Sequence, residues 1–490
     1  MRIEGTSQIK RGRASGPENQ PEHRQTSRRL RVALISPKGP LYRRSGIFKQ
    51  SLRYMPLTFP TLAALIPDDL DVALSCHDEG LADVDPARID ADLVGMTVIT
   101  GNAVRAYQLA AAFRARGVTV VLGGPHITLV PEDAAPHADA IVVGYAEETW
   151  PALLRDFARG EMKPRYDQAP DLQLTGYPLP DRSVLPSRHY ILTNVFEATR
   201  SCIHACEFCV APSAWGRKPL QKPVEAVVDD IRRRRARRGL FVDLNLISDR
   251  DYACKLFRAL APLRIRWFGL ATMRVAADEE LLDLLEASGC RGLLIGFESI
   301  VPQNLRITKK TFNHPDEYGL VVEKLHEHHI AVQGCFVFGM DEDTPEVCAQ
   351  TARLAVEIGV DLPRFAISTP FPGTPLYRRL EAEGRILSRD WELYDGQHAV
   401  FQPARMSTRE LELATAEAWR HAYSWKNIAQ RLRKSPGPVH AVALTNLGYR
   451  YYAYNLDRFY HCDWALAADP LHAVGAIPAA ARDAVRQAAR

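Results

Sequence analysis

The sequence lacks the long apolar run that a membrane-spanning helix requires. No stretch reaches roughly 18 consecutive apolar residues. Residues 1–29 have almost no apolar side chains, so they lack the core of a signal peptide. We therefore expect a disordered tail over residues 1–29 and a cytoplasmic protein without a transmembrane segment.

An excess of charge of one sign is also missing. The chain has 62 Lys and Arg residues against 58 Asp and Glu residues, a formal net charge of +4 over 490 residues. A balance so close to neutral argues against nucleic acid as a partner. The densest basic run, residues 232–238, lies at the end of a predicted helix, where arginine suits the helix dipole.

Cysteine is scarce, and nine cysteines, an odd number, exclude a disulfide scaffold. Three of them stand together as Cys202, Cys206 and Cys209, with Phe208 just before the third. Thiolates at this C-x-x-x-C-x-x-C spacing can bind three irons of a [4Fe–4S] cluster and leave the fourth open to a small molecule. A zinc knuckle is the alternative, although zinc usually takes four protein ligands. Clustered thiols also indicate a reducing cytosol.

Residues 30–160 alternate short apolar strands with helices, which predicts a doubly wound, Rossmann-like α/β domain. In such a domain the ligand lies at the carboxyl ends of the strands. Gly123 and Gly124 directly follow one strand and let a ligand approach the backbone closely. The expected strands are 31–36, 71–75, 92–98, 118–122 and 138–143.

Five prolines interrupt residues 161–189, which predicts a linker between two domains. Six longer strand–helix units follow over residues 190–405, and they predict a parallel barrel that is active at its strand carboxyl ends. The expected strands are 190–198, 241–247, 265–271, 292–298, 330–338 and 361–369. Residues 406–490 are predicted to form a C-terminal helical region that caps the barrel.

The cysteine loop resembles that of the radical S-adenosylmethionine (radical SAM) superfamily, and three strand ends after it resemble the same family. These are Gly-Leu-Leu-Ile-Gly-Phe-Glu-Ser at 292–299, Phe-Val-Phe-Gly-Met-Asp at 336–341 and Ser-Thr-Pro-Phe-Pro-Gly-Thr-Pro at 368–375. The resemblance implies a partial (β/α)6 TIM barrel. It also implies a [4Fe–4S] cluster on the three cysteines, which cleaves SAM to a 5′-deoxyadenosyl radical.

SAM is a sulfonium cation, so carboxylates and amides at strand ends suit its polar groups. Glu298 and Ser299 are the first candidates for this role, and Asp243 and Asn245 on the second predicted strand are the next. Phe208 is expected beside the cofactor as part of the cysteine motif.

The first domain resembles the cobalamin-binding domain of many radical SAM proteins. Thr97 begins the element that corresponds to the family's Ser-x-Leu, and Gly123 and Gly124 match its Gly-Gly. The family's Asp-x-His-x-x-Gly is missing after the first strand, where residues 37–40 read Pro-Lys-Gly-Pro. The resemblance implies cobalamin bound without a histidine ligand. A domain that binds nothing is the alternative.

The leading hypothesis is a cobalamin-dependent radical SAM C-methyltransferase that acts on an unactivated carbon of a small-molecule or lipid substrate. Its implied partner is an electron donor such as flavodoxin or ferredoxin. A second hypothesis is a radical cyclase, rearrangement enzyme or dehydratase that does not use cobalamin for methyl transfer. A third is a non-catalytic iron–sulfur or zinc protein.

Overall fold

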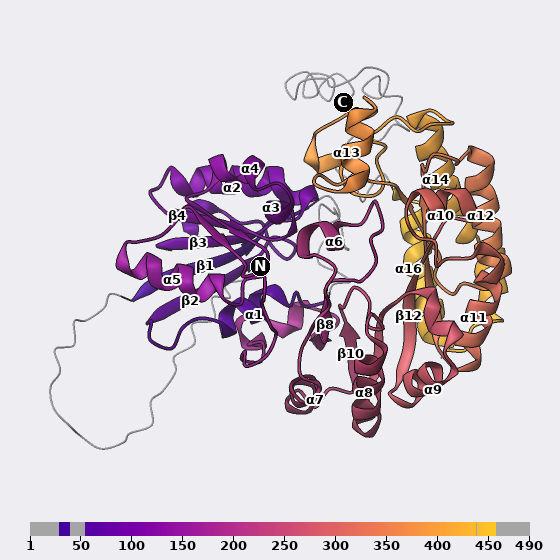
Figure 1. Ribbon diagram of the computed structural model, residues 1–490, viewed down its shortest axis with the longest axis horizontal. Helices are drawn as coiled ribbons and strands as arrows, with labels where there is room; N and C mark the ends of the chain where they lie inside the picture. Colours follow the sequence, from indigo (N-terminus) through magenta and orange to yellow (C-terminus); the bar gives the residue numbers. More distant parts are fainter. Residues whose placement is uncertain (1–28, 40–53, 438, 457–490) are drawn as a thin grey trace. The chain divides into compact units, whose positions relative to one another are not determined.

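The computed structural model in Figure 1 describes residues 29–39, 54–437 and 439–456. The predicted tail up to residue 28 and the end of the predicted C-terminal region, 457–490, lie outside the described residues. The described chain forms two compact units, the first ending at Ile191 and the second beginning at Leu192, apart from Gly39 and residues 173–175, which join the second. No helix in the described part is long and apolar enough to cross a bilayer.

The first unit is built on a six-stranded, all-parallel sheet with strand order β2-β1-β3-β4-β5-β6. The order reverses between β1 and β3, so the sheet is doubly wound and its ligand crevice is expected there. The strands are β1 (Leu30–Ser36), β2 (Val72–Asp78), β3 (Leu93–Thr97), β4 (Thr119–Gly123), β5 (Ala140–Val143) and β6 (Arg165–Asp167). The first five agree with the sequence prediction.

Helices cover both faces of this sheet (Figure 1). Helices α1 (Thr58–Ala64) and α5 (Thr149–Arg159) share one apolar core with the sheet, which includes Phe59, Trp150 and Leu34. The helices on the other side are α2 (Ala103–Arg114), α3 (Pro125–Leu129) and α4 (Pro131–Ala134).

Strand β6 lies inside the segment that the prolines predict to be a linker. Its central residue, Tyr166, is buried in the core of the first unit, and its hydroxyl donates to Asp156 over 2.9 Å. Pro164 stands just before the strand, where its missing N–H costs nothing, and its carbonyl still accepts from the N–H of Ile141. Prolines therefore border this strand without preventing it.

The second unit contains another six-stranded parallel sheet, in the order β14-β13-β12-β11-β10-β7. Every strand lies next to its sequence neighbour, and β7 and β14 remain edges, which is the arrangement of a partial barrel. The strands are β7 (Val195–Phe196), β10 (Arg238–Phe241), β11 (Arg266–Ala271), β12 (Cys290–Glu298), β13 (Ala331–Phe338) and β14 (Arg364–Ile367). The covering helices are α7 (Val224–Arg233), α8 (Arg250–Leu260), α9 (Glu279–Ala287), α11 (Tyr318–Glu327) and α12 (Pro345–Glu357).

The second strand of this sheet is not where the sequence predicts it. Strand β10 covers Arg238–Phe241 and ends where the predicted strand, 241–247, begins. Gly239 packs against the ring of Phe196 and thereby keeps β10 close to β7. Asp243 and Asn245 therefore lie in the loop after the strand and not within it.

Three C-terminal helices pack beside the last strand. These are α14 (Thr408–Ala422), α15 (Trp425–Leu432) and α16 (Val439–Ala453). Helix α14 contacts α12 and β14, and the indole N–H of Trp419 donates to the carbonyl of Phe365 over 2.9 Å. The helical region thus covers an edge strand that would otherwise expose unpaired backbone groups.

Candidate functional site

The cysteine loop follows β7 and is bracketed by a short antiparallel pair, β8 (Thr199–Arg200) and β9 (Leu220–Gln221). Cys206 is buried, Cys202 and Cys209 are half-buried, and all three carry free thiols. The N–H of Cys209 donates to the carbonyl of Cys206 over 3.1 Å, just before α6 (Val210–Trp215) begins. The turn thus brings the second and third cysteines together.

The thiols of Cys206 and Cys209 lie in a desolvated setting that contains both a cation, Lys310, and an anion, Glu298. Burial raises the pKa of Cys206 to about 12, while the ammonium of Lys310 acts in the opposite direction. Within the described residues, no group of three or more His, Cys, Asp and Glu side chains is arranged to hold a single metal ion. In a [4Fe–4S] cluster each thiolate binds a different iron, so a cluster does not require the three thiols to converge on one point.

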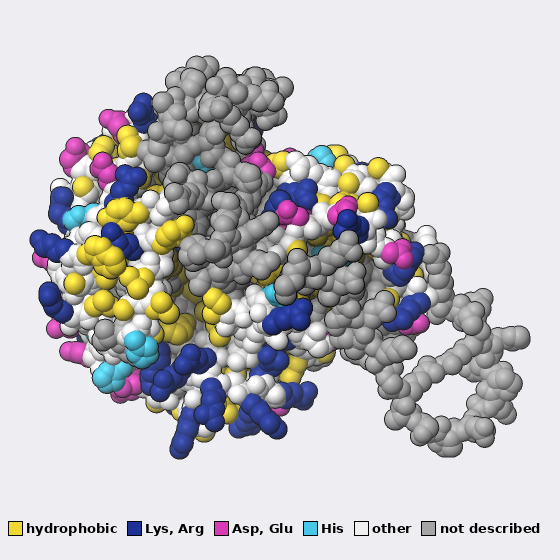
Figure 2. All heavy atoms as spheres, turned by 180° about the vertical axis from the view of Figure 1, so that it is seen from behind, with side chains coloured by type: hydrophobic (Ala, Val, Ile, Leu, Met, Phe, Trp, Pro, Cys, Tyr) yellow, Lys and Arg dark blue, Asp and Glu magenta, His cyan; other side chains and the backbone are white. Residues whose placement is uncertain are grey.

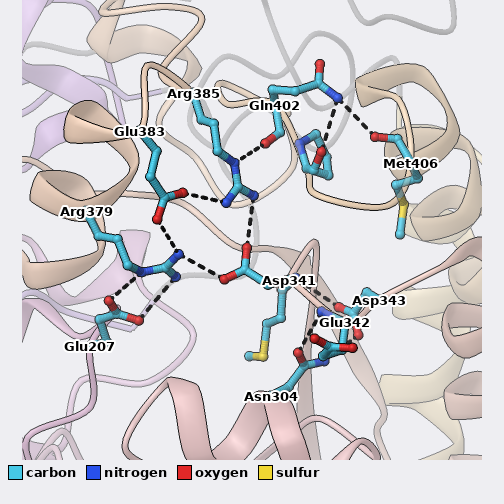
Figure 3. A network of polar contacts seen from close by, with 12 residues as sticks. Glu207, Asn304, Asp341, Glu342, Asp343, Arg379, Glu383, Arg385, Gln402 and Met406 are labelled. Carbon is cyan, nitrogen blue, oxygen red and sulfur yellow. Dashed lines mark hydrogen bonds and ion pairs between the residues drawn. The ribbon is translucent and has the colours of Figure 1, made fainter.

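Glu207, which lies between two of the cysteines, anchors the loop to distant parts of the second unit. Its N–H donates to the carbonyl of Thr308 over 3.0 Å, and its carbonyl accepts from the N–H of Leu376 over 3.1 Å. Its carboxylate pairs with the guanidinium of Arg379, in α13 (Pro375–Ala382), at 2.8 Å. Arg379 also pairs with Asp341 at 2.9 Å (Figure 3).

Arg379→Ala is expected to loosen the cysteine loop, because it leaves the buried Glu207 carboxylate without its ion-pair partner. We expect a loss of about 1–3 kcal/mol in the free energy of unfolding of the second unit. Iron per chain after reconstitution and gel filtration should also fall. Arg389→Ala is the control, because its ion pair with Glu381 is exposed and worth at most about 1 kcal/mol. Equal iron retention in both variants would contradict the anchoring role.

Glu298 and Lys310 form a buried ion pair at the carboxyl end of β12. Nζ and Oε1 are 2.5 Å apart, and each side chain is 9% exposed. Burial alone would lower the pKa of Lys310, but Glu298 and the thiols of Cys206 and Cys209 outweigh it, so the pKa is raised. A cation and an anion thus lie side by side near the cysteine loop. This matches the zwitterionic end of an amino acid.

Ser299 and its neighbours join the ends of β12 and β13. The hydroxyl of Ser299 accepts from the N–H of Val301 at 3.1 Å and from the Nδ2 group of Asn304 at 3.3 Å. Asn304 also donates to the buried Asp343 over 2.7 Å, and Asp343 accepts from the N–H of Met340 (Figure 3). Ser299 is therefore part of the bonding that fixes these strand ends.

Asp243 faces the backbone that leads into the cysteine loop. Its carboxylate accepts from the N–H groups of Ala198 and Thr199, the former at 3.0 Å. Burial, followed by the charge of Glu197, raises the pKa of Asp243 to about 7. These contacts turn the carboxylate of Asp243 toward the backbone before the cysteine loop, and its predicted cofactor contact stays a prediction.

Asn245 comes closer to the cysteines. Its Nδ2 is 4.0 Å from Sγ of Cys202. Its Oδ1 is buried and has no hydrogen-bond partner in the described part of the chain. A buried acceptor without a donor suits a ligand that brings an N–H group. Phe208, the aromatic residue of the motif, is partly buried and packs against the core of the second unit, and its place beside the cofactor stays a prediction.

Three functional candidates escape sequence reasoning: Lys310, Arg379 and Asn313. Asn313 donates to the carbonyls of Gly296 and Phe297, both at 2.8 Å, while its Oδ1 is buried without a partner among the described residues. None of the three falls at a strand end or within a motif. The only sequence signal is the short distance of Lys310 and Asn313 from the β12 end.

Thr97, Gly123 and Gly124 meet at the carboxyl edge of the first unit. Thr97 and Gly123 are register partners on β3 and β4, and the N–H of Val98 donates to the carbonyl of Gly123 over 2.8 Å. Gly124 has φ +109°, and a Cβ there would lie 2.7 Å from the carbonyl oxygen of Val98. The three predicted residues therefore lie together at one strand-end edge, where Gly124 is required by its close approach to the backbone of Val98.

His126, which follows this edge, is held by its own neighbours. Its ring is fully buried, with Nδ1 3.2 Å from the hydroxyl of Thr100 and Nε2 3.2 Å from the carboxylate of Asp133. The described loop after β1, residues 37–39, contains no histidine. This edge therefore fits a cobalamin that takes no histidine ligand from either segment.

Gly124→Ala is expected to lower the stability of the first unit by about 2–4 kcal/mol, because it combines a glycine-only backbone conformation with a backbone clash. Gly117→Ala is the matched control: its φ is +74°, but its Cβ would meet nothing within 4 Å. Thermal unfolding of both variants checks the difference. If Gly124→Ala unfolds like Gly117→Ala, the close packing at this edge is not required.

Comparisons with known proteins assign both units. Residues 68–154 match the B12 binding domain, and residues 196–355 match the radical SAM superfamily. The chain is 31% identical over 393 residues to the bacteriochlorophyllide d C-12(1)-methyltransferase of Chlorobaculum tepidum. This match covers 78% of the chain and 85% of the relative. The bacteriochlorophyllide d C-8(2)-methyltransferase of the same organism is 29% identical, and this match covers 71% of the chain and 81% of that relative.

A solved structure shares the fold. The radical SAM methyltransferase TsrM from Kitasatospora setae, with cobalamin and a [4Fe–4S] cluster bound, matches with a TM-score of 0.63. The sequences are 16% identical, and the match covers 88% of this chain and 100% of that one. The likeness at this identity concerns the architecture alone.

Proposed function

The chain belongs to the radical SAM superfamily, in the group whose members carry a B12-binding domain, and we propose that it methylates an unactivated carbon of a cyclic tetrapyrrole. The substrate class rests on the two bacteriochlorophyllide methyltransferases that the chain resembles over most of its length. The observation that carries the chemistry is the cysteine loop, held by Glu207 beside the buried Glu298–Lys310 pair.

Different residues of the chain are proposed to bind the cluster, SAM and cobalamin. Cys202, Cys206 and Cys209 would hold the cluster, and Glu298 and Lys310 would receive the amino and carboxylate groups of SAM. When bound, the cluster supplies the electron that cleaves SAM to a 5′-deoxyadenosyl radical, and cobalamin supplies the methyl group. The strand-end edge at Thr97, Gly123 and Gly124 would hold the cobalamin.

We also place the protein in the cytoplasm, with an electron donor such as flavodoxin or ferredoxin as its partner. Three free thiols in one loop support this setting, because such thiols persist in a reducing compartment.

The test is anaerobic reconstitution with iron, sulfide and cobalamin, followed by turnover with SAM, a reductant and a chlorin substrate. Methyl transfer predicts S-adenosylhomocysteine, 5′-deoxyadenosine and methylated product together. Formation of 5′-deoxyadenosine and product without S-adenosylhomocysteine would overturn methylation. If protein with an intact cluster forms no 5′-deoxyadenosine from SAM, the radical mechanism is overturned.

A second candidate is a radical cyclisation or rearrangement without methyl transfer. The chain is also 22% identical over 378 residues to the anaerobic magnesium-protoporphyrin IX monomethyl ester cyclase of Cereibacter sphaeroides, and this match covers 68% of the chain and 61% of the relative. Full activity in cobalamin-free protein would select this candidate.

A further inference from the structure

An aromatic ring is exposed on the inner face of the second sheet, the face opposite the covering helices. Trp267 stacks on Phe257 of α8 and therefore faces the helices. Side chains alternate along a strand, so Phe268 points to the inner face. Although Phe268 lies within β11, its side chain is 51% exposed. Strand interiors of a filled barrel do not show such exposure.

The ring lies over a glycine of the neighbouring strand. Phe268 and Gly292 are register partners, and a Cβ at Gly292 would be 2.6 Å from both Cδ1 and Cε1 of the ring. One side of the ring therefore covers the backbone of β12, which only glycine permits. The exposed half of its surface is the side turned away from the sheet. This is the geometry of a stacking platform.

The surroundings of the platform are apolar toward the strand centres and cationic toward the strand starts. Leu240 is the register partner of Phe268 on β10, and Leu270 lies two residues further along β11 on the same face. Two residues earlier on each strand, Arg238 and Arg266 are register partners, and both are exposed. Neither guanidinium makes an ion pair within the described residues.

We propose that this inner face binds the planar conjugated ring of the substrate by stacking on Phe268, with its carboxylate substituents directed toward Arg238 and Arg266. The inference rests on the proposed function and deepens it, because it assigns the residues that select a flat, carboxylate-bearing macrocycle. The opposite rim of the macrocycle then points to the strand carboxyl ends, where the cysteine loop lies. An aliphatic chain gains no stacking energy from this arrangement.

The probe is metal-free protoporphyrin IX, which is planar, carries two carboxylates and offers no metal to stray ligands. Full-length reconstituted protein is titrated without SAM or reductant, and the dissociation constant is read from porphyrin fluorescence. Phe268→Ala should weaken binding by about tenfold, and Gly292→Val should do the same by displacing the ring. Phe268→Trp should restore binding. Leu320→Ala, at a 52% exposed apolar residue on α11, should change nothing.

The cationic end has its own test. Arg266→Gln and Arg238→Gln should weaken binding of the dicarboxylate severalfold and leave the dimethyl ester unaffected. Palmitate binding should not respond to Phe268→Ala. Equal affinity in Phe268→Ala and Leu320→Ala, or an equal loss of palmitate and porphyrin, would overturn the platform.

These outcomes separate the platform from the proposed function. If porphyrin binding depends on Phe268 but turnover yields no S-adenosylhomocysteine, the stacking proposal is supported and the methyl-transfer proposal is overturned. If S-adenosylhomocysteine forms and Phe268→Ala changes neither the dissociation constant nor KM, methyl transfer stands and the platform fails.

Discussion

Cys206→Ala is expected to abolish SAM cleavage, lowering the rate of 5′-deoxyadenosine formation by at least about a thousandfold. Cys206 is the buried member of the three-thiol loop, so its loss would remove one of the three ligands that we propose for the cluster. Iron and sulfide content, together with 5′-deoxyadenosine after anaerobic reconstitution, measure the effect.

Cys254→Ala is the matched control for this experiment. Cys254 is also buried, but it lies in α8 and packs within the core of the second unit. Its replacement should leave iron content and SAM cleavage unchanged. A normal iron content in Cys206→Ala would mean that the cluster uses other ligands.

Lys310→Met is expected to lower the free energy of unfolding of the second unit by about 3–5 kcal/mol. The variant leaves the carboxylate of Glu298 buried without a counter-charge. The double variant Glu298→Gln with Lys310→Met should regain most of the loss, because the uncompensated charge disappears. Denaturant unfolding of the wild type, both single variants and the double variant gives the coupling between the two residues.

Lys324→Met is the surface control for the same measurement. Lys324 pairs with Glu279, whose side chain is 66% exposed, so its loss should cost at most about 1 kcal/mol. Similar losses in Lys310→Met and Lys324→Met would show that the pair at the β12 end is not effectively buried.

Apolar runs bounded by glycine and proline are sufficient to locate the first five strands of the first unit, since a buried parallel strand needs little more. Strand β10 departs from that pattern because it begins with Arg238 and owes its position to the packing of Gly239 on Phe196. Strand β6 has a single buried residue, Tyr166, and its sequence resembles a loop.

In the candidate site, too, local features can be predicted from the sequence and long-range contacts cannot. The cysteine spacing is local, so it can be recognised in the sequence, and the structure places the three thiols in one loop. Side-chain direction is not local: Asp243 turns to the backbone of Ala198, although its position after a strand suggests a ligand. Lys310 and Arg379 could not be predicted, because their importance depends on partners that only the folded chain brings near.

The anchoring of the cysteine loop has a consequence for how the enzyme is made. Glu207 and Arg379 are 172 residues apart in the chain. During synthesis the three cysteines therefore leave the ribosome long before the helix that fixes their loop exists. Iron and sulfur inserted at that moment would meet a loop without its distant support. The loop therefore gains this support only once synthesis has passed Arg379, which lies beyond the last strand of the barrel.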